Sequence, residues 1–343
     1  MNDGLPESAA QAVTLLQEAA ALRPRDAAVW GELALAWKAM AEFSAPAQTA
    51  AAVKNCELAA MRALALDPAQ PDARTARIVL RSTYGDWLTV ERGLRGVLSG
   101  APSNEAATAE LATLLQSVGR SRECGEVIDQ LVVRQPLSPV YQYRHIYMLW
   151  TGGRMGEADR AADRAFALWP RQPAVWFARL WLMGFTGRTG VALAQIDDAE
   201  ARPPGLSNAA VGLLRTSMRA IGSQDPVAIR AAVEGNLAAA AAGPSGTINA
   251  ILILSALGRL DEAFSVVNGY MLRRGARVTP ARAAGLQAVL TDTSHRHSQL
   301  LFVPVTAPLR ADARFLPMCE ACGLGDYWRR SGHRPDFLAG KPA

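Results

Sequence analysis

The sequence predicts an all-α solenoid in which pairs of helices stack along the chain. Prolines recur every 34 residues without a slip, at Pro68, Pro102, Pro136, Pro170 and Pro204. Glycines recur at the same interval midway between them, at Gly85, Gly119, Gly153 and Gly187. Apolar residues follow helical spacing on both sides of these glycines. A fixed period of this length is the signature of a repeat array.

Each unit is expected to be a helix, a tight turn, a second helix and a short link. Proline lacks an amide donor, so it belongs at helix ends and first turns. Glycine adopts the left-handed cap of a first helix at low cost. In the unit that starts at Pro139, the first helix places His145, Ile146 and Leu149 on one face. One pair cannot bury such a stripe alone, so neighbouring pairs must stack.

The elements follow in order from the amino terminus. Helices are predicted over 9–22 and 27–42. The distance from Pro24 to Pro68 is ten residues longer than the period, which indicates either a lengthened loop or extended helices. Four regular units occupy 71–204. Further helices are predicted over 207–221 and from Pro226 to Ala242, and a pair after Pro244 turns at Gly258.

This pattern resembles the tetratricopeptide repeat family. Its first-helix consensus is best matched by Trp30, Leu33, Ala34 and Trp37, and its second-helix alanines by Ala158, Ala165, Ala192 and Ala199. Ile78, Ile146 and Leu180 depart from it, because they stand where a small residue is usual. The resemblance covers residues 9 to 277 and implies a right-handed superhelix of about seven helix pairs, whose first helices line a concave groove.

The chain is predicted to divide into an array over 1–277 and a C-terminal segment over 278–343. A lone helix over 280–290 would cap the open end of the stack. The stretch from Leu300 to Leu338 resembles the ending of bacterial tetratricopeptide regulators that carry a winged-helix or cyclase-type domain upstream. Neither domain is present in the sequence, so the chain is either a free-standing relative or the C-terminal piece of a longer protein.

Charge and hydropathy favour a protein that binds neither nucleic acid nor membrane. The net charge is +5, but there are only three lysines, and arginines are scattered among acids without a run. The first residues lack the basic start and apolar core of a secretory signal. The longest apolar run, 248–257, is too short to cross a bilayer. A cytoplasmic location is therefore expected.

No enzyme, cofactor or metal site is predicted. The sequence lacks a nucleophile elbow, a phosphate-binding glycine loop and a zinc-protease signature. Adjacent acids at Asp197-Asp198 and Asp261-Glu262 would point apart on a helix. Cys56 and Cys124 fall where the helices of a unit approach closely, which favours packing. Cys319 and Cys322 have zinc-ligand spacing, but a second such pair is absent, so packing is again favoured.

The groove is the predicted binding site. Ten of the 22 aromatic residues lie between 141 and 185, and the repeat core explains only some of them. The resemblance places the others, with polar residues, on the groove face of successive first helices: Tyr143, Arg144, Tyr147, Trp150, Phe177, Trp181, Phe185, Asn208, Arg215 and Arg219. The earlier units present small or polar residues there, such as Thr113 and Ser117. Aromatic rings beside arginines are typical of binding hot spots.

The function predicted from these features is a non-enzymatic scaffold for protein–protein interactions. It would bind an extended peptide or protein segment in the groove, with rings as apolar anchors and Arg144, Arg215 and Arg219 holding acidic groups, in bacterial regulation or assembly. Two alternatives stay open. The rings could be covered by the C-terminal segment or by a second copy in a self-associating module, or they could enclose a metabolite in the sensing domain of a transcriptional or signalling regulator.

Overall fold

The computed structural model describes residues 5–43, 46–80, 84–275, 278 and 298–339, and these residues form helices joined by turns. The array contains α1 (Pro6–Leu22), α2 (Ala27–Phe43), α3 (Pro46–Leu66), α4 (Pro71–Val79), α5 (Trp87–Gly100), α6 (Glu105–Ser117), α7 (Ser121–Arg134), α8 (Pro139–Thr151), α9 (Met155–Leu168), α10 (Pro173–Phe185), α11 (Thr189–Asp197), α12 (Asn208–Ser223), α13 (Pro226–Ala242), α14 (Pro244–Ala256) and α15 (Leu260–Leu272).

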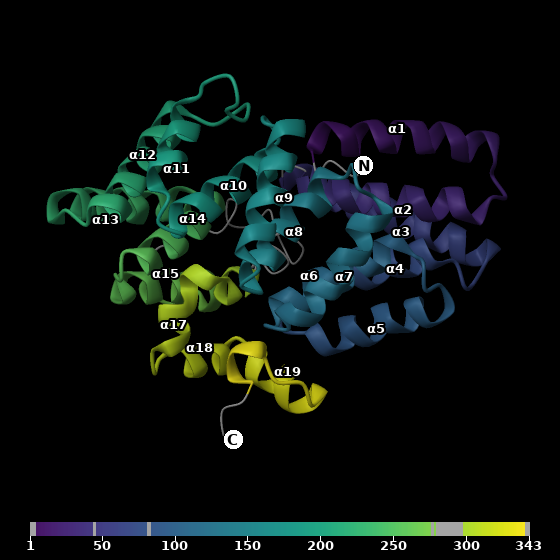
Figure 1. Ribbon diagram of the computed structural model, residues 1–343. Coiled ribbons are helices and arrows are strands. Elements are labelled where there is room, and N and C mark those ends of the chain that lie inside the picture. Colours follow the sequence, from purple (N-terminus) through teal and green to yellow (C-terminus); the bar gives the residue numbers. More distant parts are fainter. Residues whose placement is uncertain (1–4, 44–45, 81–83, 276–277, 279–297, 340–343) are drawn as a thin grey trace.

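Sequential packing organises the array. Each helix from α1 to α15 packs against the next along the chain (Figure 1), and alternate helices such as α8 and α10 also touch. The proline-bearing links lead into the helices as predicted, with Pro139 and Pro173 in the first turns of α8 and α10. The side chains of Ser138 and Gln172, just before these prolines, accept hydrogen bonds from backbone amides of the same turns. The predicted all-α architecture of stacked helices is thereby confirmed.

The periodic glycines sit in the turns between paired helices. Gly85, Gly119, Gly153 and Gly187 have φ angles of 85, 80, 73 and 83°, in the left-handed region that side chains avoid. Gly258, with φ 68°, takes the same conformation in the last pair. Each glycine therefore performs the local task that its spacing predicted.

Of the two alternatives for the additional residues between Pro24 and Pro68, a lengthened loop or extended helices, the structure shows extended helices. Helix α2 has 17 residues and α3 has 21, so helix takes up much of the additional length. These helices share an alanine-rich core, including Ala34, Ala60 and Ala63, that is separate from the larger core of the later helices. The helix predicted over 280–290 lies outside the described residues.

The C-terminal tail, defined here as residues 298–339, bridges α5 and α6 to α14 and α15. It contains η1 (Ser298–Phe302), η2 (Pro304–Thr306), α17 (Ala307–Ala311), α18 (Phe315–Ala321), α19 (Leu324–Ser331) and η3 (Asp336–Leu338). Its first part packs on α6, α14 and α15, and α19 packs on α5 (Figure 1). The Tyr84 hydroxyl also donates to the Met271 carbonyl at 2.6 Å, a direct link between the turn before α5 and α15 across 187 residues.

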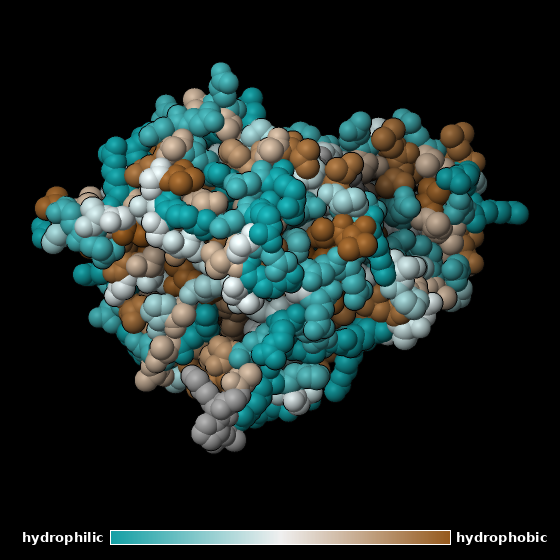
Figure 2. All heavy atoms as spheres, viewed as in Figure 1, coloured by the Kyte–Doolittle hydropathy of each residue, from teal (hydrophilic) through white to brown (hydrophobic). Residues whose placement is uncertain are grey.

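Polar and apolar residues alternate over most of the visible face, and apolar ones gather over α1 (Figure 2). On that helix Leu15 and Leu22 are 56% and 84% exposed. Among the described helices, none combines the length and the apolar character that a bilayer crossing requires.

Candidate functional site

Six of the predicted groove residues form one continuous set of rings, which we call the aromatic stack: Tyr143, Tyr147, Trp150, Phe177, Trp181 and Phe185. On α8, spacings of four and three residues align the first three rings, with centroids 6.2 and 6.3 Å apart. On α10, Phe177, Trp181 and Phe185 follow at 5.8 and 5.0 Å. Trp150 stacks on Phe185 at 6.3 Å and joins the two helices.

The rings of the stack differ in depth. Trp150 and Trp181 are only 5% and 3% exposed, so they form its base and belong to the core. The other four rings are partly buried and form its edge. Within the described residues the hydroxyls of Tyr143 and Tyr147 make no hydrogen bond, and burial raises the pKa of Tyr147. The surface available to a partner is therefore narrower than the sequence indicated.

Two of the three predicted arginines already hold the array together. Arg144 is 8% exposed and donates to the Ala109 carbonyl at 3.3 Å and the Thr113 hydroxyl at 2.5 Å, which links α8 to α6. Arg215 donates twice to Asp197, at 2.9 and 2.6 Å. On α12, Asn208 and Arg219 are exposed. Of the three predicted arginines, Arg219 is therefore the exposed one.

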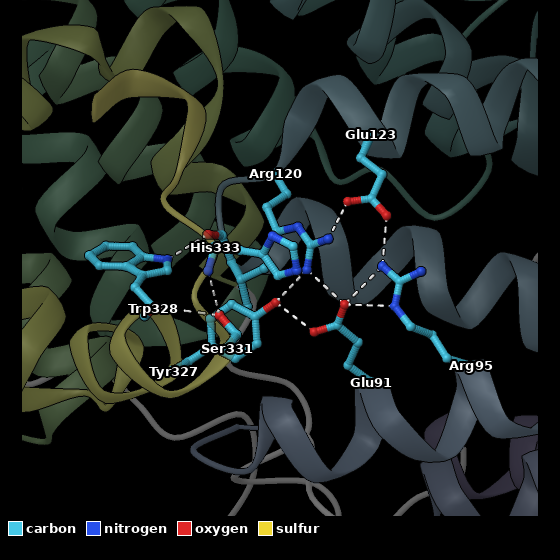
Figure 3. Close-up of polar contacts among 9 residues, drawn as sticks. Glu91, Arg95, Arg120, Glu123, Tyr327, Trp328, Ser331 and His333 are labelled. Atoms are coloured by element: carbon cyan, nitrogen blue, oxygen red, sulfur yellow. Dashed lines mark hydrogen bonds and ion pairs between the residues drawn. The ribbon is translucent and has the colours of Figure 1, made fainter. Parts of the chain in front are cut away.

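A buried polar cluster attaches the tail to the array, and we call it the tail dock (Figure 3). Arg120 Nη1 donates to Glu91 Oε1 at 2.7 Å and to the Tyr327 hydroxyl at 2.8 Å. The same hydroxyl donates to Glu91 Oε2 at 2.8 Å. Glu91, Arg120 and Tyr327 are 4, 6 and 2% exposed. Residues from α5, the turn before α7 and α19 thus close one hydrogen-bonded triangle.

Protonation in the tail dock follows from its contacts. Burial raises the pKa of Glu91, but hydrogen bonds from Tyr327, Arg95 and Arg120 outweigh it, and the net pKa is lowered. Burial, followed by the hydrogen bond to Glu91, raises the pKa of Tyr327. The carboxylate is therefore charged and the phenol protonated at neutral pH. A buried ion pair is sustained when further hydrogen bonds satisfy it, as here.

The tail also covers positions of the α6 unit that the sequence assigned to the predicted groove face. Ser298 Oγ donates to the Ser117 carbonyl at 2.6 Å, and Gln299 Nε2 to the Thr113 carbonyl at 3.3 Å. Beside them, Trp328 Nε1 donates to the Val118 carbonyl at 2.9 Å. Sequence reasoning placed Thr113 and Ser117 on the groove face but did not identify what would occupy them.

The structure places the other candidate residues in packing and ion pairs. All four cysteines are buried, and burial raises their pKa values, to about 12 for Cys56 and about 11 for Cys124 and Cys322. Asp197 binds Arg215, and Asp261 lies 2.7 Å from Arg314. Over the described ranges, no group of three or more histidine, cysteine or acidic side chains is placed to hold a metal ion.

Comparison with protein-family models and with curated proteins found no match to this chain in either set. Among the described residues, two features combine apolar surface with unmatched polar groups: the edge of the aromatic stack, and a cavity beneath the tail.

Proposed function

We propose that the protein is a non-enzymatic interaction scaffold that binds an extended peptide or protein segment across α8, α10 and α12. The observation that carries this proposal is the aromatic stack, in which rings from two successive first helices form one row. Four of its rings are partly exposed, and its two tyrosine hydroxyls have no partner among the described residues. Tyrosine and tryptophan are enriched at interfaces because they bury large areas and still offer a polar group.

The chemistry of the surface indicates an apolar segment with an acidic end. Tyr143 and Phe177 would contact apolar side chains, while Trp150 and Trp181 support them from below. Arg219 on α12 is exposed, and a guanidinium can bind a carboxylate through two parallel hydrogen bonds. Asn208 at the start of the same helix offers an amide to a peptide backbone.

The architecture supports a tetratricopeptide-type scaffold. The 34-residue period, the left-handed glycine turns and the sequential packing are the features on which the proposal rests. On this proposal the array is a right-handed superhelix of about seven helix pairs. Its setting would be regulation or assembly in a bacterial cytoplasm.

The test is a pull-down from native lysate with wild-type protein and the double variant Tyr143→Ala/Phe177→Ala. Both residues are partly buried, so this variant removes edge rings and leaves the tryptophans in place. Trp181→Ala is unsuitable, because truncating a buried tryptophan costs about 3–5 kcal/mol of stability. Leu137→Ala is the matched control, since Leu137 is 74% exposed and outside the stack.

A protein retained by wild type and by Leu137→Ala, but lost from the double variant, supports the proposal. Its affinity, measured with purified partner, should then fall by about tenfold or more in the double variant. Circular dichroism must show equal helicity in all three samples. Equal retention by all three would place the interaction elsewhere, and a concentration-dependent mass of the purified chain would favour self-association.

A further inference from the structure

A cavity of about 560 Å³ lies between the array and the tail. The start of α7, the end of α8 and the tail line it, with Gly125, Met148, Thr151, Phe302, Arg310 and Phe337 among the lining residues. A volume of this size falls in the range that holds small organic ligands, roughly 300–1,000 Å³.

The cavity lies where the repeat loses a side chain. Arg120 and Arg188 occupy equivalent positions two periods apart, and each pairs with an acid from the preceding unit, Glu91 at 2.7 Å and Asp159 at 2.7 Å. In the unit between them the arginine is Arg154, and the position of the acid is taken by Gly125. Both Gly125 and Arg154 line the cavity. The missing acidic side chain therefore leaves space at this point of the array.

Arg310 supplies a fixed positive charge without a counter-charge. Its Nη1 donates to the Leu301 and Val303 carbonyls at 2.7 and 2.8 Å and to the Thr306 hydroxyl at 2.9 Å. Across the described residues, its Nε and Nη2 have no partner. Burial is the only cause acting on its pKa, which it lowers to about 10. Arg120, Arg144 and Arg215, by contrast, are all matched by acceptors.

The remaining charged groups around the cavity are engaged or lie at its rim. Asp129 contacts His145 at 3.1 Å and Arg154 at 3.6 Å. Asp336 accepts the Arg122 backbone amide at 2.7 Å. The side chains of Arg122 and Glu126 are exposed. A second unmatched group is the Thr151 hydroxyl, whose oxygen is buried and has no partner in the described part of the chain.

We propose that this cavity binds a small monocarboxylate with an apolar body. The carboxylate would accept two parallel hydrogen bonds from Nε and Nη2 of Arg310. These two nitrogens form an edge of the guanidinium whose spacing matches the two carboxylate oxygens. The apolar body would lie against Met148, Phe302 and Phe337, the last two of which stack at 6.1 Å. The Thr151 hydroxyl would be available to a polar substituent.

Isothermal titration calorimetry on the full chain tests the proposal with phenylacetate, octanoate and cinnamate as probes. Phenylacetamide has nearly the shape of phenylacetate without its charge, and it should bind at least about tenfold more weakly. Inorganic phosphate should not compete, because it lacks an apolar body. Arg310→Lys keeps the charge but loses the fork, and it should weaken phenylacetate binding by about tenfold or more.

A second variant fills the cavity and leaves Arg310 intact. A Cβ added at Gly125 meets only the Met148 Cβ, at 3.8 Å, so Gly125→Leu can fold while its side chain takes up ligand space. Gly96→Leu is the matched control, on α5 in open space. Binding lost in Gly125→Leu and retained in Gly96→Leu, at equal helicity, is the expected result. Failure of all three carboxylates to bind, equal binding of the amide, competition by phosphate or unchanged binding by Gly125→Leu would overturn the proposal.

Discussion

Replacing Tyr327 with phenylalanine isolates the contribution of the tail dock. The change removes one hydroxyl and keeps the ring, which is 2% exposed and packed in the core. Two hydrogen bonds are lost: the one that Tyr327 donates to Glu91 and the one that it accepts from Arg120, both at 2.8 Å. Both partners are charged, so the bonds belong to the stronger class.

The expected loss of stability follows from these contacts. A hydrogen bond to a charged group contributes about 1.5–3 kcal/mol net. Glu91 and Arg120 remain joined at 2.7 Å after the substitution, and the phenol no longer has to be desolvated. Because of these two effects the loss is smaller than the summed contributions of the two hydrogen bonds. We expect the free energy of unfolding to fall by about 2–3 kcal/mol.

Urea denaturation followed by circular dichroism measures this loss, and Tyr143→Phe is the control. That variant makes the same chemical change where, among the described residues, the hydroxyl has no hydrogen bond, so its stability should match wild type. Limited trypsin digestion reports on the tail itself, since Arg329 and Arg330 are exposed on α19. Faster cleavage there in Tyr327→Phe would show that the tail opens more readily.

Acid pH supplies a further check with a defined sign. The folded pKa of Glu91 is lowered from its ordinary value of 4.5, so its contribution is present above that value and lost as pH falls through the folded pKa. Tyr327→Phe removes one of the bonds that lower this pKa, so the variant should lose stability at a higher pH than wild type. A loss below about 0.5 kcal/mol at pH 7, with unchanged proteolysis, would refute the assigned role of the dock.

Two further predictions concern the repeat itself and the thiols. Gly187→Ala should lower the free energy of unfolding by about 1–2 kcal/mol, because φ is 83° at this position and the open space around it leaves backbone strain as the cost. Gly190→Ala lies in helix α11 and also in open space, and it should raise the free energy of unfolding by about 0.5–1 kcal/mol. Urea unfolding of both variants measures these values, and effects of the same sign would contradict the assigned turn. The four buried cysteines should react with a thiol reagent at pH 8 only slowly in the folded protein and fully in urea, since burial raises the pKa of Cys56 to about 12 and of Cys124 to about 11. Rapid labelling without urea would show that this packing is open in solution.

The fold was predictable because the residues that start its helices and turn its chain act through local backbone properties. Pro139 and Pro173 start α8 and α10 through the absence of an amide donor, and Gly153 turns the chain through its left-handed φ. Neither property depends on distant residues. The extension of α2 and α3 was not predictable in the same way, because packing of their alanine-rich faces decides between helix and loop. Sequence alone therefore left both alternatives open.

The sequence predicted which side chains of the site share a helix face, but not how deeply each one is buried. Helical spacing places Tyr143, Tyr147 and Trp150 together, and the structure brings these rings into one row. How far each ring is buried depends on the next unit, where Phe185 covers Trp150. Arg144 was assigned to a ligand, yet its acceptors lie on α6, 31 and 35 residues earlier in the chain. The repeat itself supplies the partners that sequence reasoning gave to another molecule.

In the tail dock, an arginine–glutamate pair that recurs along the array also binds the C-terminal tail. After a turn glycine with a positive φ angle, Arg154 and Arg259 each pair with a glutamate three residues on, at 2.6 and 2.5 Å, and Arg120 pairs with Glu123 in the same way. Only Arg120 among these three also binds Glu91 and Tyr327 in the described structure, across 29 and 207 residues. The period identifies the shared pair but gives no signal for the distant phenol. Attachment of the tail to α5 and the turn before α7 therefore depends on non-periodic residues added to a periodic pair, and it leaves α8, α10 and α12 as the first helices on which we place a partner.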